Sequence, residues 1–369
     1  MTSLSPKFDP AALPHEIPDA VEQELRDFFD RRLSNIEDIG APVVCAAETM
    51  RDFVLGGGKR IRPLYGWAGF VGAGGLDRGE EDPQAVLRAV SSLELIQACA
   101  LIHDDIIDAS DTRRGNPTVH RLIEATHRRR GLRGDAADFG RNIAILVGDL
   151  ALVWAEDMWI ESGLSDAALH RARSAWRGMR SEVIGGQILD ISLEASGDES
   201  IELATKVNRY KAAAYTIERP LHLGAALAGA PAQTIEAFRG YGRDIGIAFQ
   251  LRDDLLGVFG DSAVTGKPAG DDLREGKRTV LLALALQELD ACDPAAARKL
   301  REGVGAVSDP ADVQRLADLV GATSAAEGVE KRIEELTTSG LAHLSAAGLT
   351  GSVAQTLREL AIKATSRRA

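Results

Sequence analysis

Apolar residues return with a helical spacing along nearly the whole chain. From Val21 onward, hydrophobic positions recur every three or four residues among Ala, Leu, Glu and Arg, and strand-like alternation is scarce. No Asn-Gly or Asp-Gly pair marks a tight hairpin between two apolar runs. The pattern predicts an all-α fold, in which residues 21–369 form one domain of mostly antiparallel helices joined by short loops.

Helix breakers set the boundaries of the expected helices. Prolines recur every fourth residue at Pro6, Pro10, Pro14 and Pro18, and a helix interior does not tolerate them. Residues 1–20 are therefore expected to form an extended or disordered arm. Glycine-rich or polar breaks follow at 72–79, 130–135, 163–166, 197–200, 229–231 and 260–270. The basic run 127–130 is expected to lie in a solvated loop.

The composition fits a folded chain in a reducing compartment. Its three cysteines, Cys45, Cys99 and Cys292, are far apart and lack metal-type spacing, which argues against a disulfide framework and indicates the cytoplasm. The N-terminus lacks the pattern of a signal peptide, and the most apolar stretch, residues 143–155, is too short to span a membrane. A net charge of −12 disfavours nucleic acid or an anionic membrane as the main partner.

Carboxylates gather at the end of one expected helix, in the stretch LIHDDIIDASDTRRGNPTVH. If residues 85–109 form one helix, Asp104 and Asp108 lie about 40° apart on its surface, with Asp105 in the same arc. If that helix continues, Asp111 returns to this face. Like charges four residues apart, and acidic groups at a helix C-terminus, are both unfavourable without a cation. The cluster therefore favours Mg²⁺, which bridges carboxylates to substrate phosphates, over a merely solvated helix end.

A second acidic pair occurs in FQLRDDLLGVFGD, residues 249–261. Asp253 and Asp254 are adjacent in an otherwise apolar helix, with Gln250 one turn earlier, about 60° from Asp253. Alone, such a pair is a weak signal. If it faces the first cluster across a bundle, the two form a cage for several metal ions, as facing helices of bundles do elsewhere.

Basic residues accompany both acidic clusters. Because the chain is acidic overall, a polyphosphate ligand would depend on local cations or on bound divalent metal. The segment GGGKRIRP is not a P-loop, since it lacks the glycine spacing and the Ser or Thr after the lysine. The candidate cations are Lys59 and Arg62 in that segment, then Arg113, Arg114, Lys211, Lys267 and Lys277.

Taken together, the ordered motifs resemble those of the trans-polyprenyl (isoprenyl) diphosphate synthases. The series is GGGKRIRP, QACALIHDDIID, RRGNPTVH, IGGQILD, YKAAAY, FQLRDDLLGVFGD and TGKPAGDDL, and it is most similar to the bacterial geranylgeranyl diphosphate synthases. The resemblance implies an all-α bundle around a deep central cavity, usually a homodimer. It also implies three bound Mg²⁺, with Mn²⁺ as a substitute, and two substrates, isopentenyl diphosphate and an allylic diphosphate.

The resemblance also assigns roles to individual residues. The metal-binding and catalytic set would be Asp104, Asp105, Asp108, Asp253 and Asp254, with Arg113 and Lys211. The isopentenyl diphosphate site would be Lys59, Arg62, Gln97 and Arg114. The allylic diphosphate site would be Arg113, Lys211, Gln250 and Lys267, and a polar pair, Gln187 and Asp190, would line the cavity. Two positions depart from the family pattern, which usually has aspartate where Gly257 stands and threonine where Ala212 stands.

The expected reaction is a head-to-tail condensation by ionisation, condensation and elimination. Aromatic residues on the first helix stop chain growth early in the family, whereas Cys99 and Ala100 are small here, which predicts a C20 product rather than C15. Ile96 and either Trp154 or Trp159 are the next expected obstacles. A longer-chain synthase (C25–C50) and a non-catalytic regulatory subunit stay open as alternatives. A terpene cyclase is disfavoured, because its second metal motif is missing.

Overall fold

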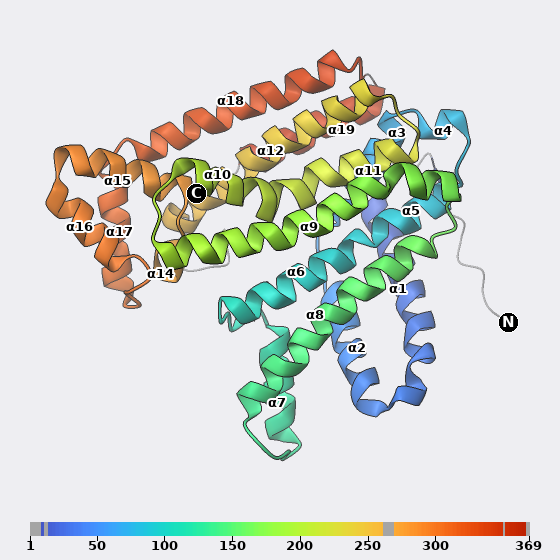
Figure 1. Cartoon of the computed structure of the whole chain (residues 1–369), viewed down its shortest axis with the longest axis horizontal. Coiled ribbons are helices and arrows are strands. Elements are labelled where there is room, and N and C mark those ends of the chain that lie inside the picture. The colour runs from blue at the N-terminus through green and yellow to red at the C-terminus, as the bar shows by residue number, and fades with distance from the viewer. Residues whose placement is uncertain (1–8, 11–13, 261–268, 350, 367–369) are drawn as a thin grey trace. The chain divides into compact units, whose positions relative to one another are not determined.

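The computed structural model describes residues 9–10, 14–260, 269–349 and 351–366. Helices make up almost all of its regular structure, which confirms the all-α prediction (Figure 1). The chain divides into two compact units, Met1–Ala175 with Pro220–Ala230, and Trp176–Arg219 with Pro231–Ala369. The single domain expected over residues 21–369 stays a prediction.

The first unit contains ten helical elements among its described residues. They are α1 (Ile17–Asn35), η1 (Glu37–Ile39), α2 (Ala41–Leu55), α3 (Ile61–Gly72), α4 (Gly75–Arg78), α5 (Pro83–Ser91), α6 (Leu93–Ile107), α7 (Val119–Arg129), α8 (Ala136–Ile160) and most of α11 (Arg219–Leu227). The long helix α9 (Asp166–Ser196) begins in this unit and continues into the second.

In the second unit, α12 (Ala232–Phe259) packs against η2 (Asn208–Glu218) and α18 (Ala325–Ala346). The other helices among the described residues of this unit are α10 (Ile201–Val207), α14 (Asp271–Glu275), α15 (Val280–Cys292), α16 (Pro294–Gly303), α17 (Pro310–Gly321) and α19 (Gly351–Thr365). The element η2 is a π-helix, a conformation that is rare and frequently found at functional sites.

Two expectations near the N-terminal half need correction. Helix α1 begins at Ile17 rather than at Val21, because Pro18 lies in its first turn, where a missing N–H costs nothing. Much of the predicted arm, residues 1–8 and 11–13, lies outside the described residues. The basic run 127–130 is mostly helical, since α7 extends to Arg129, and His127 is buried with Nε2 3.1 Å from Arg133 O.

The helix expected over residues 85–109 runs from Pro83 to Ile107, divided into α5 and α6 only at Ser92, whose backbone stays helical with φ −58° and ψ −20°. At this boundary Ser91 Oγ donates to Leu87 O and Ser92 Oγ donates to Ala89 O. Such side-chain bonds compete with the helix backbone. Helix α6 ends at Ile107, so Asp111 does not return to the acidic face. It pairs instead with Arg121, 2.7 Å away.

After α6 the chain forms a short β-hairpin, which the sequence pattern did not predict. Thr112–Arg113 (β1) pairs antiparallel with Asn116–Pro117 (β2). The turn residues, Arg114 and Gly115, have φ of 53° and 77°, as a type I′ turn requires. This type of turn usually has Asn or Asp before the glycine, because arginine rarely adopts such a φ. The sequence therefore lacks the pair of residues that would have predicted the hairpin.

One segment, Pro83–Ile107, is long and apolar enough by composition to cross a membrane, rather than residues 143–155. In this structure 78% of its most apolar window is buried inside the protein. A core helix passes the same test, so the finding is weak evidence for a membrane span. All three cysteines are free thiols, as expected.

Helices α6 and α8 touch at Gly148. A Cβ built on this glycine would overlap the imidazole of His103. His103 Nε2 lies 3.0 Å from Ile145 O, and its Nδ1 lies 3.8 Å from Cys99 Sγ. Burial raises the pKa of the Cys99 thiol to about 12, so the thiol stays protonated and can donate to Nδ1. The imidazole thus ties the two helices together one residue before Asp104.

Gly148→Ala is expected to lower the free energy of unfolding by about 1–3 kcal/mol, because the added methyl group overpacks the α6–α8 contact. Denaturant unfolding followed by circular dichroism measures the change. Gly185→Ala on α9 is the control, since nothing lies within 4 Å of its added Cβ. That substitution should stabilise by up to about 1 kcal/mol through helix propensity. Equal effects at the two positions would contradict the close contact.

Candidate active site

Arg113 lies among the carboxylates at the end of α6. Asp105 is 1% exposed, and its Oδ1 accepts hydrogen bonds from Arg113 Nε at 2.7 Å and Nη2 at 2.6 Å. The same Nη2 lies 3.6 Å from Asp104 Oδ2. A buried carboxylate without a partner is destabilising by several kcal/mol, and this guanidinium offsets that cost. Arg113 is therefore the cation that these acidic side chains contact in the structure, whereas the Mg²⁺ expected there stays a prediction.

Asp108, the third carboxylate of the motif, caps α6. Its backbone N–H donates to Asp104 O at 2.8 Å. The next residue, Ala109, has a left-handed φ of 50°, a conformation that costs energy for a residue with a Cβ. This turn ends the helix and directs the chain into the hairpin that carries Arg113. One continuous segment therefore brings Asp104, Asp105 and Arg113 together and places Asp108 at the C-terminal end of the same helix.

Arginines gather beside the hairpin turn in the first unit. Arg114 Nη1 donates to Gly57 O at 2.6 Å, and the guanidiniums of Arg60 and Arg114 both lie against Gly58. Burial lowers the pKa of Arg114; Glu94 opposes this, and the neighbouring arginines add to it. Cations crowded in this way are stabilised by an anionic ligand. The predicted binding of a diphosphate fits this arrangement.

Arg60 is a buried residue that sequence reasoning did not single out. Its Nη1 donates to Glu94 Oε2 at 2.8 Å, and its backbone has a left-handed φ of 48°. The pair holds the start of α3 against α6. It thereby positions Lys59, which is exposed, and Arg62, which is buried. No sequence signal joins Arg60 to an acid 34 residues away.

The second acidic pair lies on α12, and Asp254 is its buried member. Asp254 Oδ2 accepts from Asn208 Nδ2 at 3.2 Å, and Oδ1 accepts from Gln250 Nε2 at 2.9 Å. Burial raises the pKa of Asp254 to about 7, the nearby Asp272 carboxylate adds to the rise, and the two amide donors oppose it. Gln250, predicted to hold the allylic diphosphate, contacts this carboxylate in the structure.

The π-helix η2 carries the predicted lysine. Lys211 Nζ lies 2.5 Å from Asp190 Oδ2 on α9. Asp190, predicted to line the cavity, thus contacts the lysine that was predicted to bind the allylic diphosphate. The two elements approach closely because Gly186 has no side chain; a Cβ there would overlap the backbone of Lys211. Ala212 leaves this π-helix without the hydroxyl that the family pattern supplies.

The structure adds two residues near Asp254 that sequence reasoning missed. Asn208 donates to it directly, and Asp272 influences its charge from a separate segment. Asn208 lies two residues before the YKAAAY motif and Asp272 lies within TGKPAGDDL, but the spacing of neither residue points to Asp254. Lys277 pairs with Asp272 and with Glu275. Lys267, predicted to bind the allylic diphosphate, lies outside the described residues.

Both acidic clusters have the donor chemistry that Mg²⁺ prefers, namely hard carboxylate oxygens. Among the described residues, no group of three or more His, Cys, Asp or Glu side chains is arranged to hold an ion by itself. Mg²⁺ usually keeps several waters and binds through one or two carboxylates together with substrate phosphates. The residues present therefore fit Mg²⁺ that arrives with a diphosphate.

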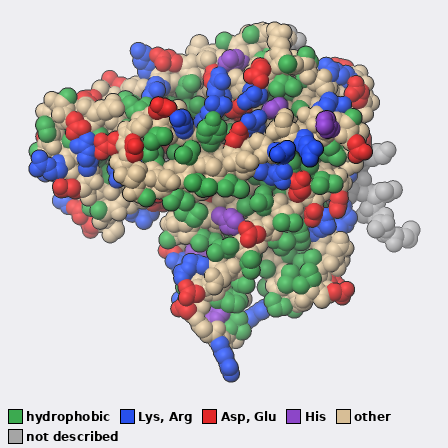
Figure 2. All heavy atoms as spheres, viewed as in Figure 1, with side chains coloured by type: hydrophobic (Ala, Val, Ile, Leu, Met, Phe, Trp, Pro, Cys, Tyr) green, Lys and Arg blue, Asp and Glu red, His purple; other side chains and the backbone are tan. Residues whose placement is uncertain are grey.

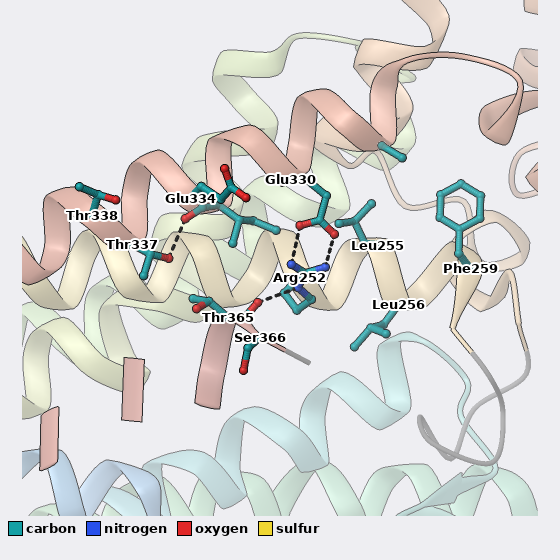
Figure 3. Close-up of a pocket in the computed structure, with 12 residues that line it drawn as sticks. Arg252, Leu255, Leu256, Phe259, Glu330, Glu334, Thr337, Thr338, Thr365 and Ser366 are labelled. Carbon is teal, nitrogen blue, oxygen red and sulfur yellow. Dashed lines mark hydrogen bonds and ion pairs between the residues drawn. The ribbon is translucent and has the colours of Figure 1, made fainter. Parts of the chain in front are cut away.

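A separate hollow of about 910 Å³ opens between α12, α18 and α19 (Figure 3). It contains none of the predicted site residues. Arg252 lines it, but Glu330 binds both ends of the guanidinium, with Nη2 2.6 Å from Oε2, and Thr365 O accepts from Nε at 2.9 Å. Because this cation is already neutralised, the hollow is not suited to a diphosphate.

Comparison with known proteins identifies the family to which the chain belongs. Residues 44–322 match the model of the polyprenyl synthetase family. A short chain isoprenyl diphosphate synthase of Methanocaldococcus jannaschii is 32% identical over 273 residues, 73% of this chain and 72% of that protein. A (2E,6E)-farnesyl diphosphate synthase of Mycobacterium bovis is 36% identical over 225 residues, 60% and 55% of the two chains.

Among solved structures, a geranylgeranyl pyrophosphate synthase from Corynebacterium glutamicum, complexed with isoprenyl diphosphate and magnesium, is 60% identical. It superposes with a TM-score of 0.94 over 97% of this chain and 100% of that chain. The family match covers most of this chain and includes both acidic clusters and the arginines beside the first. The chain is a prenyltransferase and belongs to the polyprenyl synthetase family.

Proposed function

We propose that this protein is a Mg²⁺-dependent geranylgeranyl diphosphate synthase. It condenses isopentenyl diphosphate with allylic diphosphates up to a C20 product. The observation that carries the proposal is the close packing of Asp104 and Asp105 with Arg113 beside a crowded group of arginines. Such a site suits a ligand that brings both metal ions and phosphate oxygens. The Corynebacterium glutamicum relative, named for this activity and complexed with magnesium, supports it.

The chain's own residues divide the work of binding. Asp104, Asp105, Asp108, Asp253 and Asp254 hold the metal ions, three in number. Arg113, Lys211, Gln250 and Lys267 hold the allylic diphosphate, and Lys59, Arg62, Gln97 and Arg114 hold isopentenyl diphosphate. Bound Mg²⁺ supplies Lewis-acid neutralisation of the charge that develops on the leaving diphosphate.

The positioned cations supply the rest of the catalytic effect. Fixed guanidinium and ammonium groups stabilise negative charge where it appears as the allylic carbon–oxygen bond breaks. The allylic cation is then attacked by the double bond of isopentenyl diphosphate, which its own basic residues orient. The departed diphosphate takes the proton that is lost. No histidine is needed as a base, and His103 is engaged by Ile145 O and Cys99.

The size of the product depends on the residues below the first acidic cluster. Cys99 is buried and Ala100 half-buried on α6, and both are small. Trp154 contacts the rings of Phe28 and Phe29, with centroids 6.0 and 6.1 Å apart, so it packs in the core. Ile96, also buried, is then the chain-length residue we favour beyond Cys99 and Ala100. A longer-chain synthase (C25–C50) is the alternative.

We place the enzyme in the cytoplasm, because its three free cysteines suit a reducing compartment. Gly257 and Ala212 are the two departures from the family pattern that a non-catalytic regulatory subunit would explain. Intact carboxylates at both acidic clusters, with the Arg113 contact in place, argue against that role.

We also propose that the protein is a homodimer that associates through α8. Exposed apolar side chains stand at every seventh position of this helix, at Phe139, Leu146, Val153 and Ile160. A heptad spacing keeps such residues on one side of a helix, as in paired helices. Apolar side chains are visible over α8 among the polar ones in Figure 2. A row of this kind, left in water, marks a protein contact.

With Mg²⁺, isopentenyl diphosphate and C5, C10 or C15 allylic diphosphates, the purified protein is expected to make a C20 product, identified by mass spectrometry. EDTA should abolish it. Asp104→Ala should reduce turnover at least about 100-fold, because a metal ligand worth several kcal/mol is lost. Asp30→Ala, an exposed change on α1, serves as the control. C30 or longer products would contradict the chain-length proposal alone, and no product would favour the regulatory subunit.

Leu146→Glu combined with Val153→Glu is expected to convert the dimer to a monomer, since two charges would be buried in an apolar contact. Light scattering coupled to size-exclusion chromatography gives the mass. Ile362→Glu, which changes an exposed apolar residue on α19, should leave the dimer intact. A monomeric wild-type protein, or a double variant that stays dimeric, would rule out this interface.

A further inference from the structure

Gly257 is the position where the family pattern usually has a third aspartate, and the structure shows what takes its place. A Cβ built on Gly257 would overlap the carboxylate of Asp272, at both Oδ2 and Cγ. The space a side chain at 257 would fill is therefore already occupied by an acidic group from a different segment. Any residue other than glycine at 257 would displace that group.

Residue 257 lies on the same side of α12 as Asp253. Residue 257 is one turn beyond Asp253, about 40° away around α12, so the two share one row on the helix surface. The Asp272 carboxylate thus extends the row that begins with Asp253.

Asp272 is held firmly in this place. It belongs to α14, and the neighbouring Leu273 is buried, with its carbonyl accepting from Gly305 N at 2.9 Å. Lys277 closes the loop, since its N–H donates to Asp272 O at 3.0 Å and its Nζ lies 3.2 Å from Asp272 Oδ1. The Asp272 side chain is only 13% exposed, yet the oxygen that faces Gly257 is Oδ2, not the one bound by lysine.

We propose that Asp272 supplies the third carboxylate of the second acidic cluster, and that Gly257 is required to admit it. This rests on the proposed function, because the cluster's ligand is Mg²⁺ bound with a diphosphate. The described acidic side chains are not gathered tightly enough to share one ion directly. Asp272 therefore acts through metal-bound water, as Mg²⁺ commonly keeps part of its water shell.

The competing interpretation is that Asp272 serves only to pair with Lys277. Glu275 distinguishes the two, because it also pairs with Lys277, at 2.8 Å, but does not face Gly257. If pairing with the lysine is what counts, Glu275→Gln should have the same effect as Asp272→Asn. If the carboxylate beside α12 counts, only Asp272→Asn should matter.

The decisive experiment moves the carboxylate from one segment to the other. Mn²⁺ binding is measured by electron paramagnetic resonance in the presence of inorganic diphosphate, for wild type, Asp272→Asn, Glu275→Gln and the double variant Gly257→Asp with Asp272→Ala. Asp272→Asn should weaken binding of the weakest ion by about 10–100-fold, the usual effect of losing an outer contact to a metal. The double variant should bind Mn²⁺ with an affinity within about threefold of wild type. Glu275→Gln should bind Mn²⁺ as tightly as wild type does.

Thermal unfolding of each variant shows that it is folded, and if Asp272→Asn is not, the double variant alone decides. Normal Mn²⁺ binding by Asp272→Asn, an equal loss in Glu275→Gln, or a folded double variant that does not recover would each overturn the proposal. A wild-type protein that binds no Mn²⁺ with diphosphate and makes no product would instead overturn the proposed function. The two failures are therefore distinguishable.

Discussion

The burial of carboxylates at the ends of long apolar helices is the constraint on which the site depends. Such groups are unfavourable unless something neutralises or hydrogen-bonds them. In the first unit a guanidinium neutralises the buried carboxylate, since Arg113 binds Asp105 through two nitrogens. In the second unit the neutral amides of Asn208 and Gln250 donate hydrogen bonds to the buried Asp254, and burial raises the pKa of this carboxyl. The two clusters are thus prepared differently for the same kind of ligand.

The segments that carry those partners adopt backbone conformations that are energetically unfavourable. The left-handed residues other than glycine in the described chain, Arg60, Ala109 and Arg114, all flank the first acidic cluster or its arginines. Strain of this kind persists where surrounding contacts over-determine it, and it concentrates at functional sites. Here the buried pair of Arg60 with Glu94 and the bond from Arg114 to Gly57 hold the strained turns in place. The π-helix with Lys211 follows the same principle in the second unit.

Much of this could be predicted from sequence, because helical periodicity and runs of adjacent aspartates are local signals. The all-α fold follows from the helical periodicity along the chain. Asp104, Asp105 and Arg113 could be expected near one another because they belong to one continuous stretch. The features that were not predicted depend on an unusual backbone conformation or on residues far apart in the chain. Arg114 forms a turn that normally needs Asn or Gly, and Arg60 binds Glu94, 34 residues away. Asp272 replaces a carboxylate missing at Gly257, which no spacing rule could show.

We propose that these carboxylates bind Mg²⁺ tightly only together with a diphosphate. Calorimetric titration of the wild-type protein with Mg²⁺, with and without an unreactive allylic thiolodiphosphate, tests it most directly. Because no described cluster is a complete metal cage, binding should be weak without the analogue and at least about tenfold tighter with it. Equal Mg²⁺ affinity in both titrations would contradict the claim, since the aspartates would then form an independent metal site.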